Sequence, residues 1–147
     1  MALELELTHH YYKIIPDLVE RAQKSNIHSK HAACIMQGKQ VITMNNNYVD
    51  LKKNMSIHAE ISALYSQKNL PRNLDMVVIK ATKTTIGSSK PCKSCMIALK
   101  KMGIYRVFYS IAGGQVLFEY VQDIQTDYQS SGFRWRHNLK NNKFARN

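Results

Sequence analysis

Cysteine is scarce in this sequence, and its scarcity excludes one class of protein. The 147 residues include three cysteines: Cys34, Cys92 and Cys95. A low and odd count argues against a fold held together by a disulfide framework. Two residues separate Cys92 from Cys95, and in an intracellular protein such a Cys-x-x-Cys pair indicates either a metal site or a redox pair.

Glycine, proline and long apolar runs are scarce as well. The chain has 6 glycines, 3 prolines and 44% hydrophobic residues, a composition that suits one globular domain. No run of about 18 apolar residues is present, so we expect no membrane span. The first residues have no basic start followed by a long apolar core. This argues against a secretory signal and favours an intracellular protein, cytoplasmic or nuclear.

Acidic residues are also few. The chain has 10 Asp and Glu residues against 21 Lys and Arg residues, which gives a formal net charge of +11. Such an excess indicates an anionic partner, namely a phosphate, a nucleotide or a polynucleotide. The alternative is a basic surface that is simply solvated.

Hydrophobic periodicity predicts an alternation of helices and strands. We expect helices where apolar residues recur at helical spacing, over residues 8–25, 54–67 and 91–102. Pro91 suits the first position of the third helix and Gly103 suits its end. We expect a hairpin within residues 31–45 that turns at Gly38, and single strands over 75–81, 104–110 and 115–121. Residues 45–54 and 82–90 are expected to be loops.

This order of elements predicts an α/β fold, a three-layer α/β/α sandwich built on a mixed sheet of about five strands. The last two strands are joined by the short turn at residues 111–114, which contains two glycines. A short connection forces antiparallel pairing, because a parallel return needs a long crossover. We therefore expect the last two strands to be antiparallel.

The hydrophobic pattern fades near the C-terminus, so we expect one domain over residues 1–122 and an extension over 123–147. The extension mixes aromatic and basic residues, which can stack on bases and neutralise phosphates. The alternative is a solvated tail whose aromatic residues fold back onto the core. The residues concerned are Phe133, Trp135, Phe144, Arg134, Arg136, Lys140, Lys143 and Arg146.

Two helix starts carry residues that suit metal chemistry. His58 and Glu60 open the second predicted helix, and Cys92 and Cys95 open the third. A helix N-terminus favours the thiolate form of cysteine, which is the form that binds metal. One His and two Cys suit zinc with an open fourth position, the catalytic arrangement in which water is activated. Glu60 is then well placed to take a proton from that water.

These residues form the pattern H-A-E followed by P-C-x-x-C, which resembles the signature of the zinc-dependent cytidine deaminase-like superfamily of CMP/dCMP-type deaminases. That superfamily includes cytidine and deoxycytidylate deaminases, tRNA adenosine deaminases and the APOBEC enzymes. The resemblance covers residues 27–121. It implies the cytidine deaminase-like fold, one Zn²⁺ per chain on His58, Cys92 and Cys95, and Glu60 as general acid and base.

The implied reaction is hydrolytic deamination of a nucleobase amine. The first expectation is cytosine in a nucleoside, a nucleotide or a single-stranded nucleic acid, which would give uracil and ammonia. One alternative is adenosine, as in the tRNA enzymes, or another purine. A second is an inactive relative that binds nucleic acid, and a third is a structural zinc site, which would need a fourth ligand such as Cys34 or His31. Relatives often form dimers or tetramers, so a homo-oligomer is expected.

Substrate contacts follow from the resemblance less directly. The Asn that many family members use to contact the substrate matches Asn47, although the run of three asparagines also admits Asn45 or Asn46. Ala59 is expected to lie near the substrate through its backbone. Tyr109 ends a strand and is either a base-stacking residue or part of the core.

Three further features bear on the substrate. Val49 stands where the free-nucleoside enzymes carry a Glu that contacts the sugar, which argues against a free ribonucleoside. The H-A-E form resembles the tRNA, APOBEC and deoxycytidylate branches, whereas the short last turn resembles cytidine deaminases. His28 and His31 could line the mouth of the site.

Overall fold

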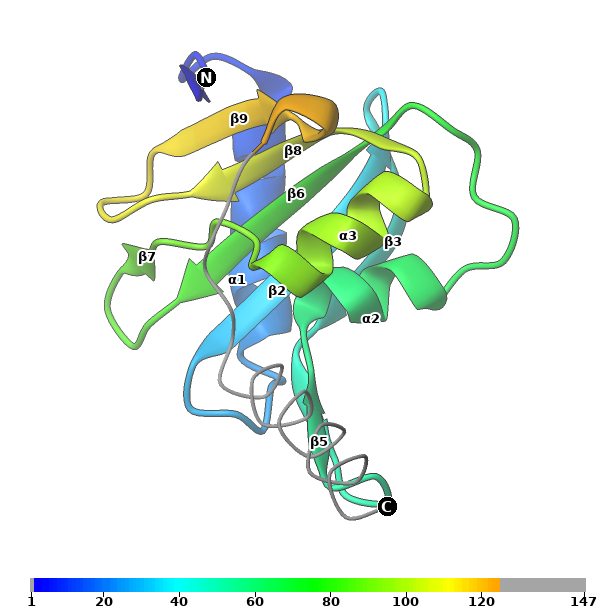
Figure 1. The fold of residues 1–147 in the computed structure, drawn as a ribbon. Helices are drawn as coiled ribbons and strands as arrows, with labels where there is room; N and C mark the ends of the chain where they lie inside the picture. The colour runs from blue at the N-terminus through cyan, green and yellow to red at the C-terminus, as the bar shows by residue number, and fades with distance from the viewer. Residues whose placement is uncertain (1, 125–147) are drawn as a thin grey trace.

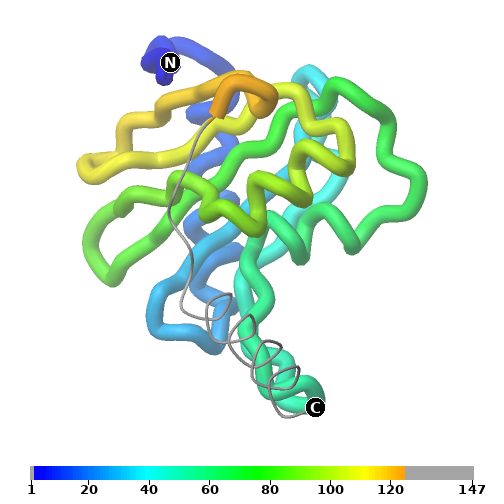
Figure 2. The backbone as a smooth tube through the Cα atoms, viewed as in Figure 1, coloured from blue at the N-terminus to red at the C-terminus, as the bar shows by residue number. Residues whose placement is uncertain are grey.

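The computed structural model of the chain describes residues 2–124 (Figures 1 and 2). The predicted aromatic and basic extension lies almost entirely outside these residues, so its role and the division into 1–122 and 123–147 stay predictions. No helix among the described residues is long and apolar enough to cross a membrane.

The centre of the fold is a mixed β-sheet with the strand order β1-β9-β8-β6-β2-β3, and β7 pairs with β6 at one end. Strands β6 and β8 run parallel and every other pair in this sheet is antiparallel. The five longer strands are those expected from the sequence, and the two-residue strands β1 and β7 are additions. The strands are β1 Leu3–Glu4, β2 Lys30–Gln37, β3 Gln40–Asn46, β6 Leu74–Ala81, β7 Ile86–Gly87, β8 Ile104–Ser110 and β9 Val116–Tyr120.

Helices cover both faces of the sheet, which confirms the three-layer sandwich (Figure 1). Helix α1 (Ile15–Ala22) packs on one face, and α2 (Ala59–Tyr65) and α3 (Lys93–Lys101) pack on the other. Two short 3-10 helices complete the described chain, η1 (His10–Ile14) and η2 (Val121–Asp123). The arrangement leaves the N-terminal ends of α2 and α3 close together beside the sheet.

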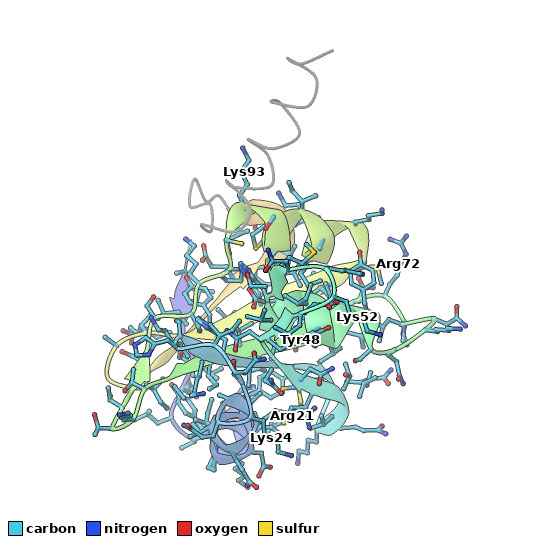
Figure 3. The ribbon with its side chains drawn as sticks, turned by 90° about the horizontal axis from the view of Figure 1, so that it is seen from below. Arg21, Lys24, Tyr48, Lys52, Arg72 and Lys93 are labelled. Atoms are coloured by element: carbon cyan, nitrogen blue, oxygen red, sulfur yellow. The ribbon has the colours of Figure 1, made fainter. Side chains whose placement is uncertain are left out.

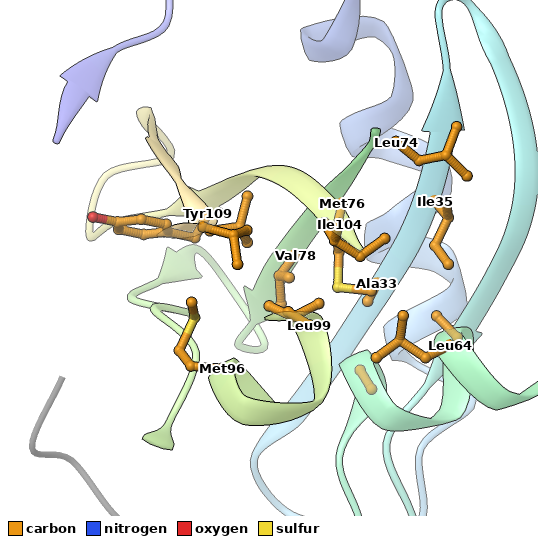
Figure 4. Packing of buried hydrophobic residues seen from close by; sticks show 14 of the residues in the cluster. Ala33, Ile35, Leu64, Leu74, Met76, Val78, Met96, Leu99, Ile104 and Tyr109 are labelled. Atoms are coloured by element: carbon orange, nitrogen blue, oxygen red, sulfur yellow. The ribbon is translucent and has the colours of Figure 1, made fainter. Parts of the chain in front are cut away.

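Strand β6 is buried on both faces, as its continuous apolar run predicts. Side chains alternate along a strand, so Met76 and Val78 join the core under α2 and α3, whereas Val77 and Ile79 join the core under α1. Figure 4 shows the first of these cores. Each fully buried aliphatic side chain stabilises the fold by about 1.5–3 kcal/mol.

The last two strands pair antiparallel, as expected, with Phe108 opposite Phe118. The turn between them depends on its glycines, because Gly113 and Gly114 have φ angles of 93° and 91°. Residues with a Cβ rarely adopt such angles, whereas glycine does so readily.

The expected loop at residues 45–54 and the expected helix start at residue 54 are both wrong. Strand β4 (Tyr48–Asp50) pairs with β5 (Met55–Ile57), and α2 begins only at Ala59. Asn54 adopts a left-handed φ of 49°, which a helix cannot accommodate. The Asp50 side chain accepts hydrogen bonds from the backbone of Lys52 and Lys53 and stabilises the turn. Ile57 therefore belongs to a strand, not to the second predicted helix.

The ends of the other two helices also differ from expectation. The region 8–25 is divided between η1 and α1, because Pro16 occupies the first turn of α1 and lacks the N–H that a preceding α-helix would need. Helix α3 starts at Lys93 with Cys92 as its N-cap, so Pro91 precedes the helix. Gly103 ends it as predicted, with a φ of 78°.

Candidate active site

His58 is held at the junction between the β4–β5 hairpin and α2. It is the N-cap residue of α2, with extended backbone angles of φ −70° and ψ 153°. Its carbonyl oxygen accepts the first hydrogen bond of the helix from Ser62 at 2.9 Å. The hairpin thus brings the chain to His58 in an extended form, and the helix fixes the direction in which the chain continues.

Cys92 and Cys95 lie at the matching end of α3. Cys92 is the N-cap and its carbonyl oxygen accepts from the backbone of Met96 at 2.9 Å. Cys95 falls in the first turn, so both thiols lie at the N-terminus of one helix, as their spacing predicts. Both are buried, with exposed fractions of 3% for Cys92 and 0% for Cys95.

The structure brings the three predicted ligands together. The Nδ1 atom of His58 lies 3.2 Å from the Sγ atom of Cys95 and 3.5 Å from that of Cys92. The three ligand atoms all lie within 4.8 Å of one another. Around one tetrahedral zinc, with bonds of about 2.0 Å to nitrogen and about 2.3 Å to sulfur, such atoms would be roughly 3.5 Å apart. The donor set and its spacing therefore fit zinc.

A fourth protein ligand is not part of this group among the described residues. Cys34, one of the two alternatives, belongs to the core under α1, on the opposite side of the sheet. His31, the other, lies outside the group. The described residues thus form the three-ligand set typical of catalytic zinc sites, not the four-ligand set of structural ones.

Contact between the two thiols shifts their pKa values in opposite directions. The pKa of Cys92 is lowered to about 3, chiefly because the Cys95 thiol donates a hydrogen bond to its sulfur, with His58 and Ser94 adding to the effect. The pKa of Cys95 is raised because it holds that proton and because it is buried. A zinc ion would replace that proton, since zinc binds cysteine as the thiolate.

Glu60 lies against this group. It is the second residue of α2, only 5% of its surface is exposed, and its carboxylate lies close enough to the Cys95 thiol to help raise the pKa of that thiol. His31 is a neighbour: burial lowers its pKa, the negative charge of Glu60 opposes that shift, and the positive charge of His58 adds to it. The structure thus places His31, the first-strand histidine considered for the site mouth, beside the catalytic candidates.

Asn47 and Asn45 both make hydrogen bonds within the protein. The side chain of Asn47, 6% exposed, accepts from the backbone of His31 at 2.9 Å and donates to the carbonyl of Ser29 at 2.7 Å. Asn45 accepts from Arg21 at 2.7 Å and donates to the carbonyl of Ser62 at 3.4 Å. Asn47 therefore lies beside His31 and the site, whereas Asn45 links β3 to α1 and α2.

The remaining two predicted contacts differ in position. Ala59 is fully buried and directly follows the candidate ligand His58, so its backbone lies at the candidate site. Tyr109 is 3% exposed and packs in the core under α2 and α3, where its hydroxyl donates to Glu119 at 2.6 Å (Figure 4). The structure places Tyr109 in the core, as the second of the two interpretations holds, and offers no open ring face for stacking.

Sequence reasoning missed the contacts that hold the loop before Cys92. Ser89 accepts a hydrogen bond from the backbone of Ser110 at 2.8 Å and donates one to the carbonyl of Val78 at 2.9 Å. Next to it, Lys90 lies 3.6 Å from the Glu119 carboxylate. These residues fix the loop to the ends of β6, β8 and β9. No local pattern reveals them, because every partner is distant in sequence.

Comparisons with known proteins agree with this site. The family model described as "Cytidine and deoxycytidylate deaminase zinc-binding region" matches residues 6–111. No curated protein sequence matches the chain.

Two solved structures are similar in fold. A cytidine deaminase from Burkholderia pseudomallei is 20% identical, with a TM-score of 0.63, over 84% of this chain and 100% of that one. A dCMP deaminase from the cyanophage S-TIM5 is 14% identical, with a TM-score of 0.56, over 73% of this chain and 86% of that one. Both likenesses support the cytidine deaminase-like fold. Since the family model covers more than half of the 147 residues, including all three candidate ligands, the chain belongs to the cytidine and deoxycytidylate deaminase zinc-binding family.

Proposed function

We propose that this protein is a zinc-dependent hydrolase that removes the amine of a nucleobase, most favourably of cytosine, as ammonia. His58, Cys92 and Cys95 would hold the zinc, and Glu60 would be the catalytic acid and base. The observation that carries the proposal is the convergence of three ligand atoms within 4.8 Å of one another, with a buried carboxylate against one of them.

The reaction requires proton transfers, and these define the role that we propose for Glu60. Water and the cytosine ring exchange an oxygen for the amine: a C–O bond forms at C4, the C–N bond breaks, and ammonia leaves. A zinc ion bound to the three ligands would lower the pKa of a water and so supply the nucleophile near neutral pH. Glu60 would accept a proton from this water, give it to the ring nitrogen, and later deliver a proton to the departing amine.

Burial suits Glu60 to this work. Its side chain is 5% exposed, so bulk water does not compete for the proton that it transfers. It is held in the first turn of α2, one residue beyond Ala59 and two beyond the ligand His58. A carboxylate so close to the ligand group can reach both a water at the metal and the ring that the water attacks.

Cytosine is favoured over adenine by the family. The matched family model is that of cytidine and deoxycytidylate deaminases, and both similar structures carry those activities in their names. Asn47 and the backbone of Ala59 are proposed as substrate contacts, and a homo-oligomer is the expected assembly.

A substrate panel tests the proposal. Wild-type protein and Glu60→Gln, both loaded with zinc, are incubated with cytidine, deoxycytidine, CMP, dCMP, adenosine, and single-stranded DNA and RNA, while ammonia and product mass are followed. We expect at least one cytosine compound to be deaminated, and turnover by Glu60→Gln to fall by about 10²–10⁴-fold. If adenosine is the only compound deaminated, the base acted on is adenine and not cytosine. Unchanged turnover by Glu60→Gln would remove Glu60 from its role.

A further inference from the structure

A cavity lies where β2 begins, next to the segment of that strand that carries His31. Its volume is about 590 Å³, and it is lined by the segment after α1, the start of β2 and the end of β6 with the loop that follows. Three lysines line it, Lys30, Lys80 and Lys83, together with His28. None of the described residues that line it is Asp or Glu.

Among the described residues, no ion pair neutralises the lysines of this cavity. In the part of the chain that the structure describes, the ion pairs are Lys90–Glu119 and Arg106–Asp75, and neither Lys80 nor Lys83 takes part in one. Lys30 donates to the backbone carbonyl of Ser25 at 2.5 Å, which holds its ammonium group in place. Several ammonium groups around one concavity create a positive potential that attracts an anion, and the low dielectric of a pocket strengthens it.

Basic residues also lie on other elements of the fold. Figure 3 views it from below, and the labelled Lys24, Lys52 and Lys93 are spread across that view. Lys24 follows α1, Lys52 lies in the turn of the β4–β5 hairpin and Lys93 begins α3. An anion approaching the site thus meets positive charge from several elements, which raises its local concentration.

The sheet connects the cavity to the ligand group. Lys80 stands directly opposite His31 in the β2–β6 pairing, and both side chains fall on the face covered by α2 and α3. His31 in turn lies near enough to Glu60, His58 and Lys80 for the charges of all three to shift its pKa. Lys30 approaches the same edge from the opposite face, because neighbouring residues of a strand alternate. His31 is therefore a neighbour both of Lys80, which lines the cavity, and of the catalytic candidates.

We propose that this cavity binds the phosphate of a substrate whose base enters the ligand group, with Lys80 and Lys83 as its main contacts and Lys30 in support. The inference rests on the proposed function and adds the substrate class: a phosphate ester, not a free nucleoside. The phosphate can belong to a mononucleotide or to a polynucleotide backbone.

Matched substrates test the inference. The substrates share one base and differ in their phosphates: deoxycytidine, dCMP and a short oligodeoxycytidine. If the substrate panel shows that the enzyme acts on adenine, adenosine and AMP replace deoxycytidine and dCMP. The variants are Lys80→Gln/Lys83→Gln and a control, Lys39→Gln/Lys68→Gln, which removes two charges at the opposite end of β2 and beyond the far end of α2. We expect wild type to prefer a phosphorylated substrate by kcat/KM.

The lysine variant should raise KM for the phosphorylated substrate by about tenfold or more, the loss expected for charge-assisted hydrogen bonds. Its kcat and its turnover of deoxycytidine should stay near those of wild type, and the control variant should behave as wild type. Added salt should weaken the binding of the phosphorylated substrate and leave the binding of deoxycytidine unchanged. Preference for dCMP identifies a mononucleotide and preference for the oligonucleotide identifies a polynucleotide; either supports the phosphate site.

Equal kcat/KM for deoxycytidine and both phosphorylated substrates would overturn the inference, as would an equal loss for all of them in the lysine variant. The proposed deamination would survive both results. If no compound is deaminated, calorimetry with zinc-loaded Glu60→Gln decides. If dCMP binds more tightly than deoxycytidine and the lysine variant loses this difference, the cavity binds phosphate even though the deaminase proposal fails. If the two compounds bind equally, the proposed phosphate site is wrong as well.

Discussion

The Nδ1 atom of His58 lies 3.2 Å from the Sγ atom of Cys95, although the two residues are 37 positions apart. They meet because α2 and α3 start at the same end of the sandwich and pack on the same face of the sheet. The backbone fold alone therefore assembles the ligand group, and zinc would bind to a site whose donors already face one another.

Replacing one ligand should abolish metal binding. Cys95→Ser removes a thiolate, and a serine hydroxyl is a poor zinc ligand, so we expect zinc content to fall from about one per chain to near zero. Cys34→Ala is the matched control. Cys34 is also buried, but on the other side of the sheet, and burial raises its pKa to about 12, so it stays a thiol at neutral pH. Elemental analysis of the purified variants measures the difference. Full zinc in Cys95→Ser would show that the metal binds elsewhere.

The hydrogen bond between Ser89 and Ser110 lies outside the ligand group, but we expect its loss to lower the affinity for zinc. Ser89→Ala leaves the backbone N–H of Ser110 without its acceptor and loosens the loop before Cys92. Groups that orient metal ligands typically contribute 10–100-fold to affinity, so we expect zinc to bind about tenfold more weakly.

Ser66→Ala is the control for this variant. It also removes a hydroxyl that makes hydrogen bonds, to Thr43 and the carbonyl of Ala63, but at the far end of α2 from His58. A competition titration against a chelator compares the three proteins. The same zinc affinity in Ser89→Ala and wild type would mean that the loop holds its position by other contacts.

A second cluster should control stability and leave chemistry alone. At the end of the sheet away from the ligand group, Asp75 accepts from Arg106 at 2.9 and 2.6 Å and from the hydroxyl of Tyr11 at 2.6 Å. Asp75→Ala leaves a half-buried guanidinium and a buried hydroxyl without a partner, which should lower the free energy of unfolding by about 3 kcal/mol. Urea unfolding measures this loss.

The exposed Asp17 of α1 supplies the comparison. Asp17→Ala removes the same carboxylate from a solvated position and should change stability by less than about 1 kcal/mol. Turnover per folded molecule should be the same for both variants. An equal effect of the two substitutions on unfolding would show that the Asp75 cluster contributes little.

The sequence predicted what depends on local pattern. His58, Glu60, Cys92 and Cys95 stand in two short motifs, and the apolar run of β6 and the glycine turn before β9 are equally local. The β4–β5 hairpin escaped prediction because its polar residues show no alternation, and its turn depends on the left-handed backbone of Asn54. The hydrogen bond between Tyr109 and Glu119 could not be predicted either, because only the pairing of β8 with β9 brings the two residues together.

Deamination by this protein should depend on one zinc held by His58, Cys92 and Cys95. The most direct measurement is to strip the purified chain with a chelator, restore zinc in steps, and follow ammonia release from the best substrate of the panel against bound zinc. We predict that activity rises in proportion to zinc and reaches its maximum at about one zinc per chain. Turnover that stays the same with and without zinc would contradict the account.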